Sequence, residues 1–395
     1  MSRMDSQVAI LESTGVSVSV SSFYVSDGAS EYHLLIRPLD IGTVEEQLDR
    51  IEVAYSEALF ELELHRNTAV TRRFYCSDVQ NARHALKAHA LSNPRAAGEP
   101  CAASWIGQAP MPPAKVSMWA YHISDELTPL IKSQSDSTTI LKRGELAHHW
   151  TAGLVNTVES SPYGQTQGIF HDYLEHLSRH NLRLADHVVR TWFYVQDVDS
   201  NYGGMVSARK EIFLKHGLTA DTHFIASTGI EGRSSDIRAK VMLDSYAIAG
   251  LRPGQVEYIA ALDHLSPTHV YGVTFERATS VAYQDRKHIF ISGTASIDKD
   301  GNIVHAGDVG HQLERTLENV EALLEQAGSS LEDMRIFLVY VRDPSDQTFA
   351  LNRMRERFGD VPIEVVVAPV CRPGWLIEVE GVAVVQSCNP DLPRF

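Results

Sequence analysis

The sequence has few cysteines, no run of basic residues and no long apolar run. Its four cysteines are widely spaced and form no Cys-x-x-Cys pair, so the pattern favours a reducing compartment and gives no zinc motif. No stretch approaches the roughly 18 apolar residues of a membrane-spanning helix, and the first residues lack the apolar core of a signal peptide. We therefore expect a cytoplasmic protein with no membrane partner.

The charge balance argues against nucleic acid as a partner. The chain has 50 acidic and 35 basic residues, a formal net charge of -15, and no window with more than two adjacent lysines or arginines. Because phosphate backbones are bound by clustered basic side chains, this composition predicts no nucleic-acid partner.

What the chain does have is length and a repeated order of elements. Its 395 residues, 44% of them hydrophobic, suffice for two or three domains. Residues 287–385 read as strand, strand, helix, strand, helix, strand, strand. The expected helices are 311–326 and 347–358, and the expected strands are 289–297, 303–305, 334–341, 363–368 and 375–385. This order predicts an α+β unit with two layers, a mixed sheet covered by helices on one face.

A similar order of elements occurs twice more upstream, so the chain is expected to hold tandem units. The elements are expected at 32–38, 44–59, 69–75, 81–90 and 115–123 in the first copy, and at 149–155, 165–177, 188–195, 204–216 and 240–248 in the second. The polar segment 124–144 and the turn 250–254 would separate the copies. We predict a degenerate first unit at 1–127, a second at 128–252 and a third, carrying the main site, at 253–395.

Two glutamates on the last expected strand are the main candidates for chemistry. Glu378 and Glu380 are two residues apart, so both side chains would point to one face, about 6.5 to 7 Å apart. The equivalent positions hold Ser117 and Trp119 in the first copy and Met242 and Asp244 in the second. The pair is either a solvated face or a catalytic pair, since neighbouring carboxylates raise one another's pKa and can keep an acid protonated near neutrality.

The third copy resembles the reactive-intermediate deaminase (Rid, YjgF-like) superfamily. The segments that carry the resemblance are Phe-Ile-Ser-Gly at 290–293, Gly-Asp at 307–308, Thr-Leu-Glu-Asn at 316–319, Ala-Gly-Ser-Ser-Leu at 327–331 and Ile-Glu-Val-Glu at 377–380. Rid proteins assemble as trimers with ligand clefts between neighbours. The resemblance therefore implies an intrachain pseudo-trimer, either monomeric or a low-order homo-oligomer. Ile363 stands where Rid imine deaminases place the arginine that binds the substrate carboxylate.

Over about 190–385 the chain is similar, more narrowly, to the chorismatases, a branch with the Rid fold that hydrolyses chorismate. The similar segments are 190–194, 226–230, 271–272, 275–278, 290–296 and 372–380. One departure is that only Val273 and Thr274 separate the Tyr-Gly pair from the Phe-Glu-Arg-Ala segment, where chorismatases carry extra residues including an arginine. The resemblance implies a hydrolase or lyase that releases pyruvate from a small cyclic carboxylate, without a cofactor, between the second and third copies.

The resemblance also implies the site residues. Glu378 or Glu380 would be the acid, and the substrate-binding residues would be Arg372, Arg277, Tyr271, Ser292, Gly293, Thr294, Cys371, Gly229 and Arg233. Cys371 has two interpretations, a thiolate nucleophile beside an arginine or ordinary buried packing. Two other functions stay open: a diverged imine or enamine deaminase, and a module that binds a small ligand without chemistry.

His148 and His149 are a further conspicuous pair. They begin an expected strand, and no third ligand follows them at metal-binding spacing. The sequence therefore predicts a pair at the surface and no metal site.

Overall fold

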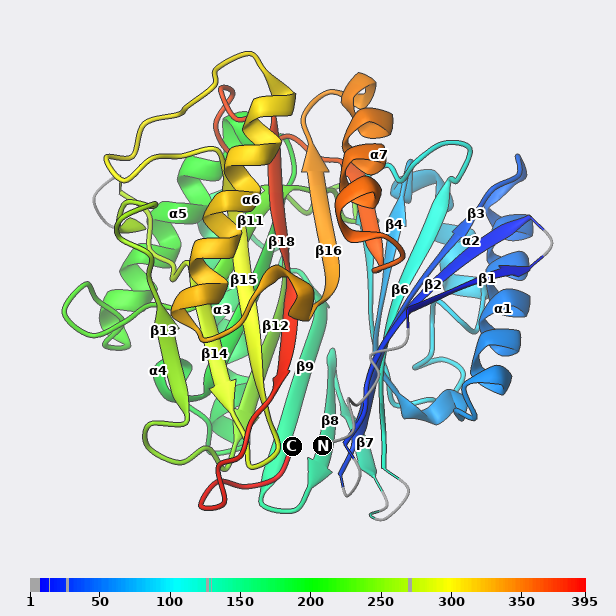
Figure 1. The fold of residues 1–395 in the computed structure, drawn as a ribbon, viewed down its shortest axis with the longest axis horizontal. Helices are drawn as coiled ribbons and strands as arrows, with labels where there is room; N and C mark the ends of the chain where they lie inside the picture. Colours follow the sequence, from blue (N-terminus) through cyan, green and yellow to red (C-terminus); the bar gives the residue numbers. More distant parts are fainter. Residues whose placement is uncertain (1–7, 14, 26–27, 126–127, 129, 269–271) are drawn as a thin grey trace.

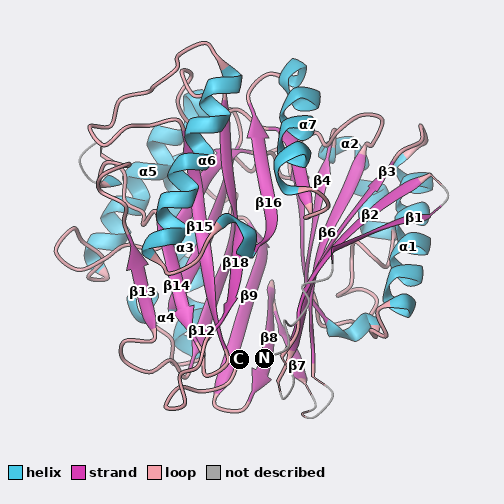
Figure 2. Ribbon diagram, viewed as in Figure 1, coloured by secondary structure: helices cyan, strands magenta, loops and turns pink. Residues whose placement is uncertain are grey.

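The computed structural model describes residues 8–13, 15–25, 28–125, 128, 130–268 and 272–395. In these residues the strands form three mixed sheets of six strands each, which follow one another along the chain (Figures 1 and 2). The orders are β1-β2-β3-β6-β4-β5, β7-β8-β9-β12-β10-β11 and β13-β14-β15-β18-β16-β17, so the same topology occurs three times. The α+β class with tandem Rid-like units is confirmed.

The bounds of the elements show how closely the three units correspond. The first unit contains β1 (Val8–Ser13), β2 (Val16–Phe23), β3 (Ser30–Pro38), α1 (Val44–Glu61), β4 (Ala69–Cys76), α2 (Val79–Ala88), β5 (Ala102–Gly107) and β6 (Val116–Ser124). The second contains β7 (Ile131–Ser135), β8 (Thr138–Arg143), β9 (Leu146–Leu154), α3 (Pro162–Arg179), α4 (Leu184–His187), β10 (Val188–Val195), α5 (Val198–Lys215), β11 (Ala226–Glu231) and β12 (Val241–Ala249). The third contains β13 (Val256–Ile259), β14 (Ala278–Ala282), β15 (Arg286–Ala295), α6 (Val309–Gln326), β16 (Met334–Val341), α7 (Gln347–Phe358), β17 (Ile363–Val367) and β18 (Ile377–Gln386).

Each sheet has one parallel strand pair, and its other pairs are antiparallel. The parallel pairs are β4 with β5, β10 with β11 and β16 with β17. A parallel pair requires a crossover connection, and α2, α5 and α7 provide it in the three units. No helix in the described part of the chain is long and apolar enough to cross a bilayer.

Two expectations about the edges of the sheets were wrong. The segment 124–144, expected as a polar boundary, contains β7 and β8, which pair along their whole length. β7 is the edge strand, and its side chains are mostly polar and all partly or fully exposed, so its sequence reads as a linker. Residues 303–305, expected as an extended strand, contribute only a single bridge between Ile303 and Ile297.

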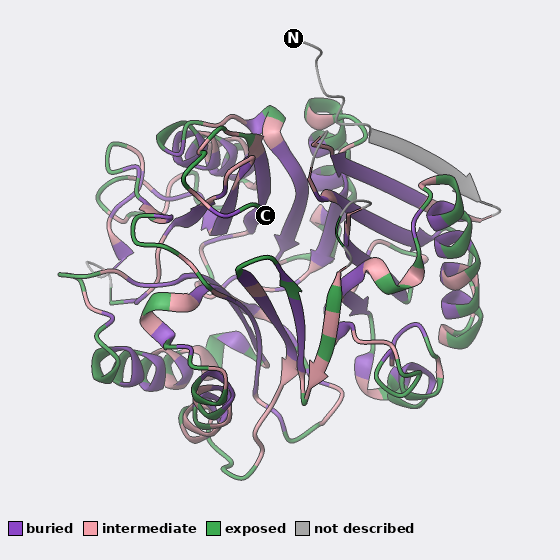
Figure 3. Cartoon of the chain, turned by 90° about the horizontal axis from the view of Figure 1, so that it is seen from below, coloured by how far each residue is buried: buried purple, intermediate pink, exposed green. Residues whose placement is uncertain are grey.

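The three units contact one another through their sheets, and the helices lie on the outside (Figure 3). An isolated bridge joins Gly107 to Arg233, a second joins Ala109 to Val367, and a third joins Ile230 to Val370. These bridges connect the first unit to the second, the first to the third and the second to the third. Each unit therefore contacts both others, and the pseudo-trimer stands as our proposal for the functional arrangement.

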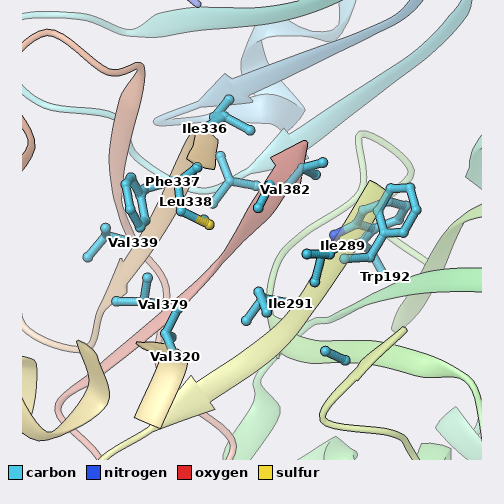
Figure 4. Packing of buried hydrophobic residues seen from close by; sticks show 14 of the residues in the cluster. Trp192, Ile289, Ile291, Val320, Ile336, Phe337, Leu338, Val339, Val379 and Val382 are labelled. Atoms are coloured by element: carbon cyan, nitrogen blue, oxygen red, sulfur yellow. The ribbon is translucent and has the colours of Figure 1, made fainter. Parts of the chain in front are cut away.

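The principal core continues across the boundaries between units. One cluster of buried residues includes Trp119 from the first unit, Trp192 from the second and Phe290 from the third. Figure 4 shows part of it, where side chains of β15, β16 and β18 pack together. Every residue of β16 is buried, which agrees with the nearly continuous apolar run at 334–341. Because the faces turned inward are apolar, the polar groups among them stand out as candidates for function.

Candidate active site

A pocket lies between the second and third units, with an empty volume of about 510 Å³ that includes its open mouth. The second unit contributes Tyr202, Arg209, Ser227 and Gly229, and the third contributes Val273, Phe275, Arg277, Gly293, Ala295, Ile297, Cys371, Arg372, Trp375 and Glu378. The residues expected from sequence and present here are Glu378, Arg372, Arg277, Gly293, Cys371 and Gly229.

Glu378 is the acidic group of the cavity. It lies on β18 and is buried, with 5% of its surface exposed. Burial and, to a smaller extent, the neighbouring Glu380 raise its pKa to about 8, although Arg190 and Arg277 act in the opposite direction. A carboxyl group with this pKa carries its proton at neutral pH, so Glu378 can donate a proton to a bound ligand.

Glu380 has a different environment, although it lies only two residues away. It is 1% exposed and accepts hydrogen bonds from four side chains of the second and third units. The donors are Arg190 Nη2 at 2.6 Å, Trp192 Nε1 at 2.9 Å, Tyr340 Oη at 3.0 Å, and the Thr228 hydroxyl. The interpretation of the pair as a solvated face is therefore wrong. Glu380 is a buried anion held by its donors, and Glu378 faces the cavity.

Gly293 lets the carboxyl group of Glu378 approach the backbone of β15. A Cβ atom at position 293 would lie 2.2 Å from Oε1 of Glu378, closer than any side chain allows. The amide N–H of Gly293 also donates to the Thr228 hydroxyl at 2.8 Å. The glycine therefore leaves room for the Glu378 carboxyl group beside the strand, and its amide bonds to one of the donors around Glu380.

Two of the predicted arginines give the cavity positive charge. Arg277 is buried, and its Nη2 donates to the backbone oxygen of Ser266 at 2.9 Å. Arg372 is partly exposed, and its guanidinium lies 5.3 Å from the centroid of the Trp375 ring. The two guanidinium groups give this wall of the cavity positive charge, which suits an anionic ligand.

The sequence analysis missed Arg209 and Tyr202, which α5 brings to the same cavity. Arg209 is almost completely buried, and its Nη1 lies 3.4 Å from the Ser227 hydroxyl. A signal was present in the sequence, because Met205 and Phe213 flank Arg209 four residues away on either side, on a buried helix face. A charged residue at the centre of an apolar helix face marks a polar site.

The thiol of Cys371 lines the cavity but is not activated. Burial raises the pKa of Cys371 to about 12, and the nearby Glu378 adds to the effect. A thiol with this pKa is protonated at neutral pH. Burial thus favours the interpretation of Cys371 as a packed residue of the cavity wall over that of a thiolate nucleophile.

Ser292 and Thr294 do not line the cavity. The Ser292 hydroxyl accepts from the amide of Ser227 at 2.9 Å and donates to the backbone oxygen of Glu276 at 2.6 Å. The Thr294 hydroxyl donates to the backbone oxygen of Ser292 at 2.9 Å. Successive residues of a strand point to opposite faces of the sheet. Because Gly293 faces the cavity, Ser292 and Thr294 point away from it. They contribute to the frame and do not contact a ligand there.

Two other predicted residues are not at the cavity. Arg233 is half exposed and pairs with Asp197 at 2.9 Å, in a separate open depression near Asp78. Arg233 follows the end of β11 at Glu231, whereas the residues of β11 that line the cavity, Ser227 and Gly229, lie earlier in the strand. Tyr271 lies outside the described residues.

The two adjacent histidines of β9 are not a surface pair, so that prediction was wrong. His148 and His149 are both buried. Nδ1 of His148 lies 2.6 Å from the hydroxyl of Tyr246, toward the other units. His149 points to the opposite face of the sheet, toward α3, because neighbouring residues of a strand alternate.

Comparison with known proteins identifies the class. Residues 276–385 match the family model described as Endoribonuclease L-PSP. A RutC family protein from Pyrococcus abyssi is 35% identical over 97 residues, which are 24% of this chain and 76% of that protein. The chain belongs to the Rid (YjgF-like) superfamily, as its sequence and fold predicted.

Two further proteins are similar to the chain over longer stretches. A 3-hydroxybenzoate synthase from Streptomyces hygroscopicus is 27% identical over 224 residues, which are 50% of this chain and 63% of that protein. The match thus spans less than two thirds of that relative. A crystal structure of a chorismatase matches the fold with a TM-score of 0.60 at 17% identity, covering 80% of this chain and 93% of that one.

Proposed function

We propose that the protein is a chorismatase-like hydrolase or lyase that releases pyruvate from chorismate or a related cyclic enol-ether carboxylate. The observation that carries this proposal is a protonated, buried carboxyl group, Glu378, facing a cavity lined by three arginines. A proton donor suits the cleavage of an enol ether, and the cationic wall suits a substrate with two carboxylates. The relatives named above support this substrate class.

Glu378 begins the reaction by donating its proton to the methylene carbon of the enolpyruvyl group. The π electrons form the new C–H bond, and the ether carbon becomes an oxocarbenium ion. Water adds to that carbon, and the Glu378 carboxylate takes a proton back. The hemiketal then collapses to pyruvate and the ring alcohol, a dihydroxycyclohexadiene carboxylate. Internal attack by a ring group, in place of water, would lead instead to a hydroxybenzoate.

The surrounding residues set up the acid and hold the substrate. The fixed negative charge of Glu380 raises the pKa of Glu378, and the donors around Glu380 keep that charge in place. Arg372 and Arg277 bind the carboxylates of the substrate. Arg209, on the wall contributed by the second unit, supplies further positive charge.

The test is to incubate the purified protein with chorismate and to follow pyruvate with a coupled lactate dehydrogenase assay, while the ring product is identified by mass spectrometry. We expect stoichiometric pyruvate and one ring product. Imines of the 2-iminobutyrate type are the comparison substrate. Fast imine turnover without pyruvate from chorismate would favour the deaminase alternative. We do not expect this result, because the position of the deaminase clamp holds Ile363, a buried strand residue without a charge. Tight binding of chorismate without product would favour a binding module.

The pH profile reports the protonation state of the acid. Glu378 must carry its proton to act, and its pKa is raised to about 8. We therefore expect kcat/KM to be maintained toward neutral pH and to fall above about pH 8, where the free enzyme loses that proton. Initial rates of pyruvate release across pH 5 to about 10 check this, with stability monitored at each pH. Activity that rises steadily above pH 8 would instead indicate a general base.

Replacement of Arg372 by alanine should weaken substrate binding more than it slows the reaction. Arg372 is partly exposed, so we expect a loss of about 2 kcal/mol, or roughly 30-fold in Kd, the lower range for a charge-assisted contact. Calorimetry with a non-reactive cyclic dicarboxylate measures the change. Arg353→Ala is the control, because Arg353 is an exposed arginine of α7 that pairs with Glu314 and Glu356. Equal affinity in the two variants would exclude Arg372 from the binding site.

A further inference from the structure

Three histidines meet on the outer side of the second sheet, at the end of α3. His149 lies on β9, and His176 and His180 are four residues apart on the last turn of α3 and its cap. The spacing of four residues places His176 and His180 on one face of the helix. His149 is on the side of the sheet that α3 covers, so the three rings converge although 27 residues separate His149 from His176.

The geometry of the nitrogens is close to that of a metal site. Nδ1 of His149 and Nε2 of His176 lie 3.2 Å apart. Two ligands of a tetrahedral zinc ion, each about 2.0 to 2.1 Å from the metal, are about 3.3 Å apart. One nitrogen from each of the three histidines lies within 4.8 Å of those of the other two. His180 is partly exposed at the helix end, so a rotation of its side chain can bring its nitrogen to the shorter spacing.

The three rings already contact one another. Their centroids lie 4.7 to 5.5 Å apart, and Nδ1 of His149 and Nε2 of His176 are hydrogen-bonded, so one of these nitrogens donates its N–H to the other. A bound ion would replace this hydrogen bond, and the donor would carry its proton on its other ring nitrogen.

Other charged groups face the cluster from the neighbouring elements. Lys142 on β8, Arg179 on α3 and His187 on α4 lower the pKa of one or more of its histidines, and Asp136 raises that of His176. Arg179 is paired with Asp136 at 3.3 Å, which offsets part of its charge. The remaining cationic field weakens metal binding but does not occupy the ligand nitrogens.

We propose that His149, His176 and His180 bind one divalent transition-metal ion, of which Zn²⁺ is the expected occupant. Three imidazole nitrogens suit zinc, cobalt or nickel, whereas magnesium and calcium require oxygen ligands. A tetrahedral ion would keep its fourth position for water or for an external ligand. The bound ion would tie β9 to the end of α3. This proposal does not depend on the proposed enzyme activity, because it uses none of the residues that line the active-site cavity.

The test uses untagged protein dialysed against a chelator and then titrated with Co²⁺, whose visible absorption reports tetrahedral imidazole ligation, followed by displacement with Zn²⁺. We expect one equivalent per chain and a rise in Tm on saturation. His180→Gln changes a partly exposed residue at a helix end, so this variant should fold, and it should lose at least tenfold in Co²⁺ affinity and the Tm rise.

The matched control is His171→Gln. His171 is an exposed histidine on the same helix, and its Nε2 lies 3.5 Å from a carboxylate oxygen of Glu175. This variant should bind Co²⁺ as the unaltered protein does. Absence of a saturable cobalt band, or equal binding by the His180 and His171 variants, would overturn the proposal. The first result would mean that the histidines are only packed together, and the second that the ion binds elsewhere, for instance at the exposed Cys388.

Discussion

Replacement of Glu378 by glutamine is expected to lower turnover by a factor of about 10² or more, the usual scale for loss of a positioned general acid. Glutamine has nearly the same shape and can occupy the space beside Gly293, but it has no proton of suitable acidity. Substrate affinity should change little, because the arginines that bind the carboxylates remain. Steady-state kinetics of pyruvate release, with separate values of kcat and KM, measure the effect.

The matched control for this variant is Glu364→Gln. Glu364 is also fully buried, with its pKa raised by burial to about 7, but it lies on β17 against Ser117 of the first unit, away from the cavity. The Glu364→Gln variant should therefore have unchanged turnover. If both glutamine variants kept full turnover, Glu378 would not be the acid, and if both lost it equally, the loss would reflect the fold.

Glu378 also makes the free energy of unfolding depend on pH. The pKa of Glu378 is about 8 in the folded protein and near the ordinary 4.5 when the chain is unfolded. Between these values the unfolded chain has released a proton that the folded chain retains, so stability falls as pH rises from about 4.5 to about 8. A residue that serves the reaction thus opposes folding increasingly from about pH 4.5 to about pH 8, and the glutamine variant should lose this dependence.

Replacement of Arg190 by methionine is expected to destabilise the protein by about 3 to 5 kcal/mol, because it leaves Glu380 as a buried charge without its cation. Arg190 and Glu380 are both nearly inaccessible and their charged atoms lie 2.6 Å apart. Urea denaturation followed by circular dichroism measures the loss. The double variant Arg190→Met with Glu380→Gln should recover part of it, because a neutral amide needs no counter-charge.

Arg353→Met is the control for stability, since both ion pairs of Arg353 are at the surface and contribute little. A loss below about 1 kcal/mol in the Arg190 variant would mean that Glu380 takes up a proton when its partner is removed. In that case the pKa of Glu378 should fall as well, and the alkaline limit of activity should move to lower pH.

The helices and central strands could be predicted from the sequence because their patterns are strong. The strands 188–195 and 334–341 and the helix 347–358 have the predicted bounds, since continuous apolar runs and helical spacing leave little choice. The edge strand β7 could not be predicted, because none of its side chains is fully buried and its sequence resembles a polar linker.

The candidate site could be predicted only where one segment carried the signal. The third unit supplied Glu378, Arg277 and Arg372 within segments similar to a known family. Arg209 comes from the second unit, and only the packing of the units against each other directs it to the cavity. The histidine cluster likewise joins a strand to a helix end, and spacing along the chain gives no sign of such a contact.

The three sheets belong to one covalent chain, and this has a consequence for how the protein behaves on dilution. The cleft that contains Glu378 needs the second and third units together, and a chain that links them keeps their local concentration in the millimolar range or above. Trimers assembled from separate subunits come apart at low concentration, but here the specific activity should stay constant down to the detection limit. Linkage also makes the clefts unequal, since the first and second units place an Arg73–Asp244 pair between them. Residues that line one cleft can thus differ from those of the other two, while the interfaces at the other two clefts stabilise the arrangement of the units.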